Sequence, residues 1–255
     1  MAKLAKRMGI SVIALTDHDT VEGLEAFSNG CRENGVACVP GIELSAKVEP
    51  SMTVHILGYR LLRSEPVREA MDWVIGRRND RNRRICARLQ ELGMDVRIED
   101  IEREAKGQVL ARPHFASFMI RKGYVADRET AFSQYLAEGG LAYEPRETYP
   151  PNDCISIIRD AGGFPVLAHP NTTRLEGEDL DALLSELKGF GLWGMECMSS
   201  HVPPEKSLEY LTVASRHGLY ATAGSDFHGG NRPNVAMGVQ VREDFLPWAR
   251  LGVRI

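Results

Sequence analysis

Short apolar runs alternate with longer amphipathic stretches along this chain. Residues 10–16 form a continuous apolar run, which is the pattern of a strand buried on both faces of a parallel sheet. Residues 20–34 predict the helix that follows, because Asp19 and Glu22 have the spacing of a capping box at its start. Similar strand patterns recur near residues 36–45, 52–60, 164–169, 191–197 and 219–224. The alternation therefore predicts an α/β fold.

A long helical segment interrupts this alternation. Residues from Glu65 to about Leu92 predict one helix, because apolar side chains recur on one of its faces. These side chains are Val67, Met71, Val74, Ile85, Leu89 and Leu92. Further helices are expected near residues 2–8, 98–105, 113–122, 127–137, 150–161, 178–188 and 203–217. We therefore expect one α/β domain from residues 1–61 and 146–255, with a helical insertion over residues 62–145.

Imidazole and carboxylate side chains stand at the ends of the strand-like runs. The residues that share this position are His18, Glu43, His55, His169, Asp226 and His228. In barrel-like α/β folds the strand ends meet at one face, and a cluster of divalent metals needs such ligands. A single histidine at a strand end is more often a hydrogen-bonded structural residue, but the repetition favours a shared metal site.

Three nearby acids have simpler interpretations that compete with metal binding. Asp17 is interpreted as a partner that orients a ligand histidine, since such histidines commonly donate their second N–H to a carboxylate. Asp19 is also explained as a helix cap. Asp226 is also explained as the start of a turn before Gly229 and Gly230.

Composition excludes several classes of partner. The 255 residues carry a formal net charge of -4, so no basic footprint predicts a stable nucleic-acid partner. No stretch is long and apolar enough to span a membrane. The five cysteines are widely spaced, without a C-x-x-C pair, which favours reduced thiols and a cytoplasmic location. The sequence gives no oligomeric state.

The order of these segments resembles a known family. Leu15–Thr20, Gly41–Glu43, His55–Gly58, Ala168–Pro170 and Gly224–His228 are similar to the ordered motifs of the PHP (polymerase and histidinol phosphatase) superfamily. Two further segments, Ala111–Ala116 and Ser199–His201, resemble its branch of nucleoside 3′,5′-bisphosphate phosphatases and 5′→3′ exoribonucleases. The resemblance covers essentially the whole chain. It implies a distorted (β/α)7 barrel that holds up to three divalent metals, often manganese, although Fe²⁺, Zn²⁺ and Mg²⁺ suit such ligands too.

The resemblance also implies a role for each candidate ligand. Glu43 resembles the carboxylate that bridges two metals, and His55 and His169 resemble the remaining protein ligands of the second metal. Asp226 resembles a ligand of the first metal. The ligands of the third metal are implied to be His18 and His228.

One part of the family pattern is absent from this sequence. The family opens with a strand that carries His-x-His and, a few residues later, an Asp or His. No His-x-His occurs anywhere in this chain, so two ligands of the first metal and one of the third are missing. We expect a barrel without its first strand, hence lower stability and impaired activity. Truncation or a misplaced start competes with natural loss as the explanation.

The implied activity is metal-dependent hydrolysis of phosphate esters. The expected substrates are nucleoside 3′,5′-bisphosphates or the 5′ ends of short RNA, and the expected step is attack of a metal-bound hydroxide on phosphorus. We expect Glu43, Asp226 and His228 to be catalytic. Two alternatives remain: a histidinol-phosphate or sugar-phosphate phosphatase, and a non-catalytic module that binds metal.

Substrate recognition is expected from the helical insertion and the late loops. Arg112 offers a fork of donors that matches a phosphate group, and His114 and His201 add further donors. The competing interpretation is that Arg112 and Pro113 only open a helix, with His114 on its surface. A stripe of arginines at helical spacing has two interpretations as well, phosphate steering or packing over a partner surface. The stripe contains Arg77, Arg81, Arg84 and Arg88.

Overall fold

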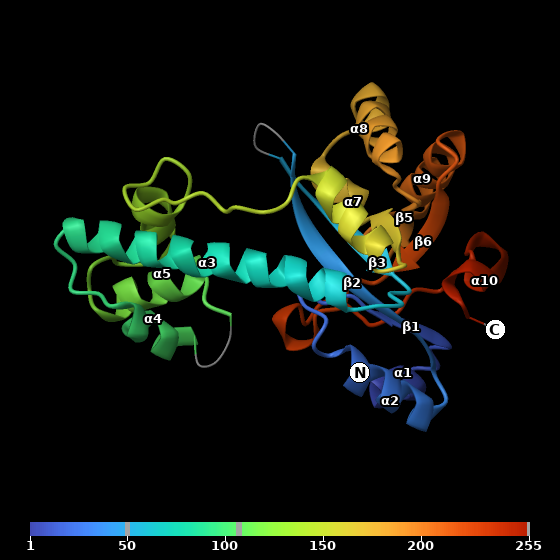
Figure 1. Ribbon diagram of the computed structural model, residues 1–255, viewed down its shortest axis with the longest axis horizontal. Coiled ribbons are helices and arrows are strands. Elements are labelled where there is room, and N and C mark those ends of the chain that lie inside the picture. The colour runs from blue at the N-terminus through green and yellow to red at the C-terminus, as the bar shows by residue number, and fades with distance from the viewer. Residues whose placement is uncertain (49–51, 106–108, 254–255) are drawn as a thin grey trace. The chain divides into compact units, whose positions relative to one another are not determined.

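The computed structural model describes residues 1–48, 52–105 and 109–253 of the chain (Figure 1). Contacts divide the chain into two compact units. The first unit contains Met1–Met71 together with Thr148–Ile255. The second contains Asp72–Glu147.

A curled six-stranded sheet forms the centre of the first unit (Figure 1). Its strands are β1 (Val12–Leu15), β2 (Ala37–Val48), β3 (Met52–Tyr59), β4 (Phe164–Leu167), β5 (Gly194–Ser199) and β6 (Tyr220–Gly224), and they lie side by side in chain order. β1 is parallel to β2, as its apolar run predicts, and β4, β5 and β6 are parallel to one another. The predicted burial of β1 on both faces is wrong, because it is an edge strand in which Ile13 alone is buried. The predicted α/β fold is confirmed in this form.

The pairing around β3 differs from a simple repeat of strand and helix. β3 is antiparallel to both β2 and β4, and only residues 49–51 separate β2 from β3. Antiparallel neighbours need no helical crossover, so a helix between these two strands is not required. The seven-fold (β/α) description is therefore not confirmed.

Helices of the first unit cover this sheet. They are α1 (Ala2–Arg7), α2 (Leu24–Asn34), α7 (Pro151–Asp160), α8 (Gly177–Phe190), α9 (Pro204–Arg216) and α10 (Trp248–Leu251). α8 shows why the sequence forms these elements, because Leu180, Leu183, Leu184 and Leu187 recur at helical spacing and are all buried. It ends where Gly191 adopts a left-handed conformation with φ of 102°.

The predicted start of the second helix is wrong. α2 begins at Leu24 rather than near residue 20, and no side chain caps its first turn. Asp19 does not form a capping box with Glu22; its Oδ1 instead accepts a hydrogen bond from the main-chain N–H of Ser45 at 3.4 Å. The physical reason is strand pairing: the segment before the helix continues alongside β2, where the Asp19 N–H donates to the carbonyl of Glu43 at 3.0 Å.

The second unit is helical throughout its described residues. α3 (Glu65–Glu91) begins in the first unit and continues into the second, followed by α4 (Ile98–Ala105), α5 (Arg112–Arg121), α6 (Arg128–Ala131) and a π-helical turn, Phe132–Leu136. A buried cluster that includes Ile85, Leu89, Phe115, Phe118 and Leu136 forms its core. The side chains predicted on the apolar face of α3 are buried. Leu92 is the exception, because it lies beyond the end of the helix and is exposed.

Candidate metal centre

Strand pairing places Glu43 and His55 on one face of the sheet. In the β2–β3 register, Glu43 is opposite Leu57 and Ser45 is opposite His55. Side chains two residues apart share a face, and so do cross-strand pairs. Glu43 and His55 are therefore diagonal neighbours on that face.

His169 reaches the same place from β4. It follows that strand by two residues, and the main-chain N–H of the preceding Ala168 donates to the carbonyl of His55 at 3.0 Å. His169 has a φ of 25°, outside the conformations that most residues adopt. Backbone strain of this kind is tolerated when the surrounding structure fixes it, and it clusters at functional sites.

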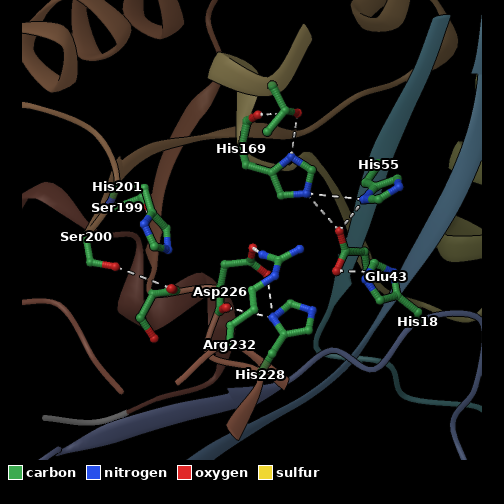
Figure 2. A network of polar contacts seen from close by, with 12 residues as sticks. His18, Glu43, His55, His169, Ser199, Ser200, His201, Asp226, His228 and Arg232 are labelled. Carbon is green, nitrogen blue, oxygen red and sulfur yellow. Dashed lines mark hydrogen bonds and ion pairs between the residues drawn. The ribbon is translucent and has the colours of Figure 1, made fainter. Parts of the chain in front are cut away.

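Three side-chain atoms from β2, β3 and the end of β4 form a close triangle (Figure 2). His55 Nδ1 lies 2.7 Å from Glu43 Oε1 and 3.2 Å from His169 Nε2. His169 Nε2 lies 3.0 Å from Glu43 Oε1. Ligand atoms that sit about 2.1 Å from one cation at right angles to each other are about 3 Å apart. The triangle therefore has the dimensions of one face of a coordination octahedron.

The second oxygen of Glu43 faces a different histidine. His18 Nδ1 lies 3.6 Å from Glu43 Oε2, and a parallel β-bridge joins the two residues. Ligand-capable atoms of His18, Glu43 and His55 all lie within 4.8 Å of one another. One buried carboxylate thus presents Oε1 to His55 and His169 and Oε2 to His18, which is the arrangement that a bridging ligand needs.

Hydrogen bonds select the nitrogen that two of the histidines present. The Thr172 hydroxyl donates to the carbonyl of His169 at 3.0 Å, so its oxygen accepts from Nδ1–H of His169 at 2.9 Å. His228 Nδ1 lies 2.7 Å from the carbonyl oxygen of Asp226, which only a donor can satisfy. In the neutral form, Nε2 of each ring then carries the lone pair that a metal requires.

The turn after β6 brings Asp226 and His228 into the same group of side chains (Figure 2). Asp226 has a φ of 50°, and its carboxylate lies 3.3 Å from His228 Nδ1 through Oδ1. Oδ2 forms an ion pair with Arg232. The His228 ring centre lies 5.8 Å from that of His18, so both histidines belong to one cluster.

Charge within the cluster shifts the pKa of its members. Burial alone would raise the pKa of Glu43, but hydrogen bonds with His169 and His55 outweigh burial and lower that pKa well below its usual range. Burial would lower the pKa of His169, and its hydrogen bond with Glu43 reverses the direction. For His18 burial prevails and lowers the pKa. An anion surrounded by imidazoles is the electrostatic pattern of a cation site.

Sequence reasoning missed Glu196, which contacts the main chain of His169. Glu196 in β5 is 5% exposed, and its Oε2 accepts a hydrogen bond from the main-chain N–H of His169 at 2.7 Å. Burial raises the pKa of Glu196 to about 7. The signal was present in the sequence as an acid in the middle of the apolar run Leu192–Cys197, because acids are almost never fully buried without a partner.

The remaining predicted residues lie in different surroundings. His201 is exposed after β5, where the hydroxyl of neighbouring Ser200 donates to the carbonyl of Ser225 at 3.4 Å (Figure 2). Asp17 contacts Glu43 through its main-chain carbonyl, which accepts the Glu43 N–H at 3.1 Å. Arg112 and His114 belong to the second unit. There, Nδ1 of His114 accepts the main-chain N–H of Ala111 at 3.0 Å and caps the start of α5.

A cavity of about 1430 Å³ opens beside the cluster. It is lined on one side by β1 and on the other by the end of β6, and His18, Glu43, His169, Asp226 and His228 all contribute to its wall. Polar and apolar groups share this wall. The cavity gives the clustered side chains access to a ligand of nucleotide size.

Comparisons with known proteins identify the family of this chain. Residues 1–112 match the PHP domain model. The 5′-3′ exoribonuclease Rnm of Salmonella typhimurium is 31% identical, over 88% of this chain and 77% of the relative. The 3′,5′-nucleoside bisphosphate phosphatase of Chromobacterium violaceum is 29% identical, over 96% of this chain and 87% of the relative.

A solved structure has the same fold. It is that of a predicted metal-dependent phosphoesterase from Bifidobacterium adolescentis, with a TM-score of 0.73 and 27% identity over 95% of this chain and 86% of the other. Within the residues that the structure describes, no helix is long and apolar enough to cross a bilayer. By its sequence and its fold, the chain belongs to the PHP family of metal-dependent phosphoesterases.

Proposed function

We propose that this chain hydrolyses phosphate esters of nucleotides, either a phosphate monoester of a nucleoside 3′,5′-bisphosphate or the 5′ end of a short RNA. The observation that supports it most is the triangle of Glu43 Oε1, His55 Nδ1 and His169 Nε2, with sides of 2.7 to 3.2 Å. Relatives named for nucleoside bisphosphate phosphatase and exoribonuclease activity support the nucleotide class. We further propose a cytoplasmic location, consistent with five free cysteines.

Two groups of side chains would hold the metals. The triangle of Glu43, His55 and His169 would hold one ion, with Glu43 shared as a bridge through its second oxygen. Asp226, His18 and His228 would contribute to the neighbouring positions. The mixed imidazole and carboxylate ligands suit Mn²⁺, which we propose as the native ion, with Fe²⁺, Zn²⁺ and Mg²⁺ as substitutes. When bound, such ions supply Lewis-acid chemistry that activates water near neutral pH and neutralises charge on phosphoryl oxygens.

The chain's own residues would then orient the reaction. Glu43 is held by two imidazoles on Oε1 and faces His18 with Oε2, so it positions both groups of ligands relative to each other. His228 donates from Nδ1 to the Asp226 carbonyl, which leaves Nε2 as its ligand atom for a metal at the neighbouring position. In a site without that metal, Nε2 would instead carry the proton that assists departure of the leaving alkoxide.

Substrate contacts are proposed for three residues. His201 follows β5 in the first unit, and its exposed side chain is free to meet a phosphate or a base. Arg112 opens α5 in the helical unit, and its Nη1 donates to the carbonyl of Leu136 at 3.0 Å, which leaves other donors of the fork for a ligand. His114 spends Nδ1 on the cap of α5, so its contribution to a ligand would come from Nε2.

The ligand sets are unequal, and this predicts unequal affinity. Glu43, His55 and His169 converge within hydrogen-bond distance, whereas the carboxylate of Asp226 is already paired with Arg232. We therefore propose one tight metal site and at least one weak site. Activity that needs both would be low until the metal concentration fills the weak one.

Phosphate release tests the proposal directly. The full chain, stripped of metal and supplied with Mn²⁺, should release phosphate from 3′-phosphoadenosine 5′-phosphate or mononucleotides from a short 5′-phosphorylated RNA. Glu43→Gln should abolish release while Glu178→Gln, an exposed acid in the first turn of α8, leaves it unchanged. Tight Mn²⁺ binding without release from either substrate would instead indicate a non-catalytic metal-binding module, and release only from sugar phosphates would reassign the substrate class.

A further inference from the structure

Two cysteines lie where α2 packs against the sheet. Cys31 is in the C-terminal half of α2, and Cys38 is the second residue of β2. Cys31 is fully buried, whereas Cys38 is half-buried. Both side chains belong to the apolar cluster that also contains Ala5, Ile13 and Phe27. Neither cysteine is in a disulfide, so both carry a free thiol.

The strand register directs Cys38 towards α2. Its neighbours Ala37 and Val39 belong to a different apolar cluster, because successive side chains of a strand point to opposite faces of the sheet. Ile13, which is opposite Cys38 in the β1–β2 pair, lies in the same cluster as both cysteines. The face of β2 that carries Cys38 is therefore the face that α2 covers.

The buried side of α2 presents Cys31 to that face. Phe27 and Cys31 are the buried residues of this helix, and their spacing of four places both on one side of it. The chain then turns back at once, because Gly35 ends the helix with a φ of 69° and the Val36 N–H donates to the Cys31 carbonyl at 3.1 Å. This short return brings the thiols of Cys31 and Cys38 within hydrogen-bonding reach of each other.

The two thiols differ in reactivity. Burial, together with the neighbouring Cys38 thiol, raises the pKa of Cys31 to about 11, so Cys31 remains protonated at neutral pH. Cys38 is the thiol of the pair that solvent reaches. A small oxidant therefore meets Cys38 first, and Cys31 is placed as the thiol that resolves the oxidised form of Cys38.

We propose that Cys31 and Cys38 are a reversible redox pair whose disulfide fastens α2 to β2. Hydrogen peroxide first oxidises Cys38 to a sulfenic acid: an S–O bond forms, the O–O bond breaks and water leaves. The Cys31 sulfur then attacks the Cys38 sulfur, so that the S–S bond forms and the S–O bond breaks, and the Cys31 proton leaves in a second water molecule. The two sulfurs together lose the two electrons that the peroxide gains. A dithiol reductant restores both thiols by exchange.

The disulfide would restrain the edge of the sheet. β1 is held by its pairing with β2 and by the cluster under α2, and the same pair of segments continues to the bridge between His18 and Glu43. A cross-link that closes a short loop also restricts the unfolded chain. The oxidised protein should therefore melt a few degrees above the reduced protein. Disulfides in the cytoplasm are usually transient and sense the redox state, which suits a reversible fastening.

Peptide mapping tests whether the disulfide forms. The full chain, freed of metal with a chelator, is treated with hydrogen peroxide, its remaining thiols are blocked in denaturant, and the protein is digested with trypsin. Trypsin cleaves after Arg32, between the two cysteines, so the disulfide joins peptides 8–32 and 33–47 until a dithiol separates them. We expect this linked pair of peptides to be the predominant disulfide. Its absence, or its presence only in dimers on a non-reducing gel, overturns the proposal.

Thermal melting tests whether the disulfide fastens the fold. Peroxide should raise the melting temperature of the wild type by a few degrees, and a dithiol should reverse the rise. Cys38→Ser should show no rise, and Cys31→Ala replaces it if that variant does not fold. Cys86→Ala is the matched control, because Cys86 is a buried cysteine of the helical unit, and it should behave like the wild type.

Two outcomes of the melting experiment contradict the fastening. The first is a wild type that forms the linked peptides but melts at the same temperature or lower after oxidation. The second is a rise that persists when either cysteine of the pair is replaced, since another site of oxidation would then cause it. Because metal and substrate are absent from these measurements, failure of the proposed hydrolytic function does not change any of their results.

Discussion

The side chain of Thr172 determines which ring nitrogen of His169 is available to a metal. Thr172 Oγ1 donates to the His169 carbonyl and accepts from Nδ1 at 2.9 Å, and this leaves Nε2 directed at Glu43. Groups that orient a ligand histidine are commonly worth 10- to 100-fold in metal affinity. The short turn that follows β4, Pro170–Thr173, would therefore contribute to the proposed metal centre by orienting His169.

Removing this hydroxyl should weaken metal binding. Thr172→Val keeps the shape of the side chain but loses the acceptor for His169 Nδ1–H, so we expect Mn²⁺ affinity to fall about 10-fold or more. Isothermal titration measures the change. Thr173→Val is the control, since its hydroxyl donates to the Pro170 carbonyl and does not touch His169. Equal losses in both variants would show that the turn acts through its stability alone.

Arg232 should compete with a metal at Asp226. Its guanidinium pairs with Oδ2 of Asp226, and a cation bound there must displace it. Arg232→Gln should therefore tighten the weak metal site several-fold and leave the tight site unchanged. A two-site Mn²⁺ titration measures both affinities. Arg242→Gln, which breaks a pair with Asp244 instead, serves as the control, and weaker binding in Arg232→Gln would contradict the competition.

Stability of the helical unit should depend on pH through Glu144. Burial would raise the pKa of Glu144, but hydrogen bonds from Arg84 and Arg88 outweigh it and lower that pKa below the ordinary value of 4.5. A carboxyl with a lowered folded-state pKa stabilises the fold above its unfolded-state pKa, and this contribution is lost as the pH falls through the folded-state value. Glu144→Gln should therefore lower the melting temperature at pH 7.

The same variant should lose this effect in acid. Below the folded-state pKa of Glu144 the wild-type carboxyl is protonated as well, so the two melting temperatures should converge. Glu147→Gln changes a carboxylate that is 41% exposed and should show a smaller difference at pH 7. A Glu144→Gln deficit that is the same at pH 7 and in acid would exclude the ionic origin.

Close packing of α7 on β3 should make Gly58 intolerant of a side chain. A Cβ at Gly58 would lie 2.9 Å from Ile158 Cγ1 and 3.1 Å from Ile42 Cγ2, which is too close for carbon atoms. Gly58→Ala should destabilise the protein by about 1–3 kcal/mol through overpacking. Gly76→Ala is the matched control, because a Cβ there meets no atom within 4 Å and the position is inside α3. It should stabilise by up to about 1 kcal/mol, and denaturant unfolding measures both.

The sequence identified several side chains that lie close together in the fold, but it did not predict how all of them are brought there. His169 and Asp226 follow β4 and β6, as the apolar runs predict. The prediction that Glu43 and His55 also stand at strand ends is wrong, because they lie inside β2 and β3. The antiparallel register of those two strands brings their side chains together. The capping role of Asp19 could not be judged in this way. Its carboxylate is held by Ser45, 26 residues away in the chain, and long-range pairing of this kind overrides a local motif.

The orientation of single side chains could not be predicted from the sequence either. Glu196 could have been suspected as an acid inside an apolar run, but its contact with the His169 main chain depends on how β4 and β5 are aligned. The arginine stripe of α3 is similar. Its arginines repeat at helical spacing, and only the position of Glu144 and Glu147 in the fold decides which of them pair with these acids.

Anomalous diffraction from crystals soaked in MnCl₂ tests the central claim most directly. We predict a manganese peak within about 2.0–2.3 Å of Glu43 Oε1, His55 Nδ1 and His169 Nε2. The same peak should be absent from crystals of Glu43→Gln. A peak that avoids these three atoms, or none in soaked wild-type crystals, would contradict the metal centre and with it the proposed phosphoesterase chemistry.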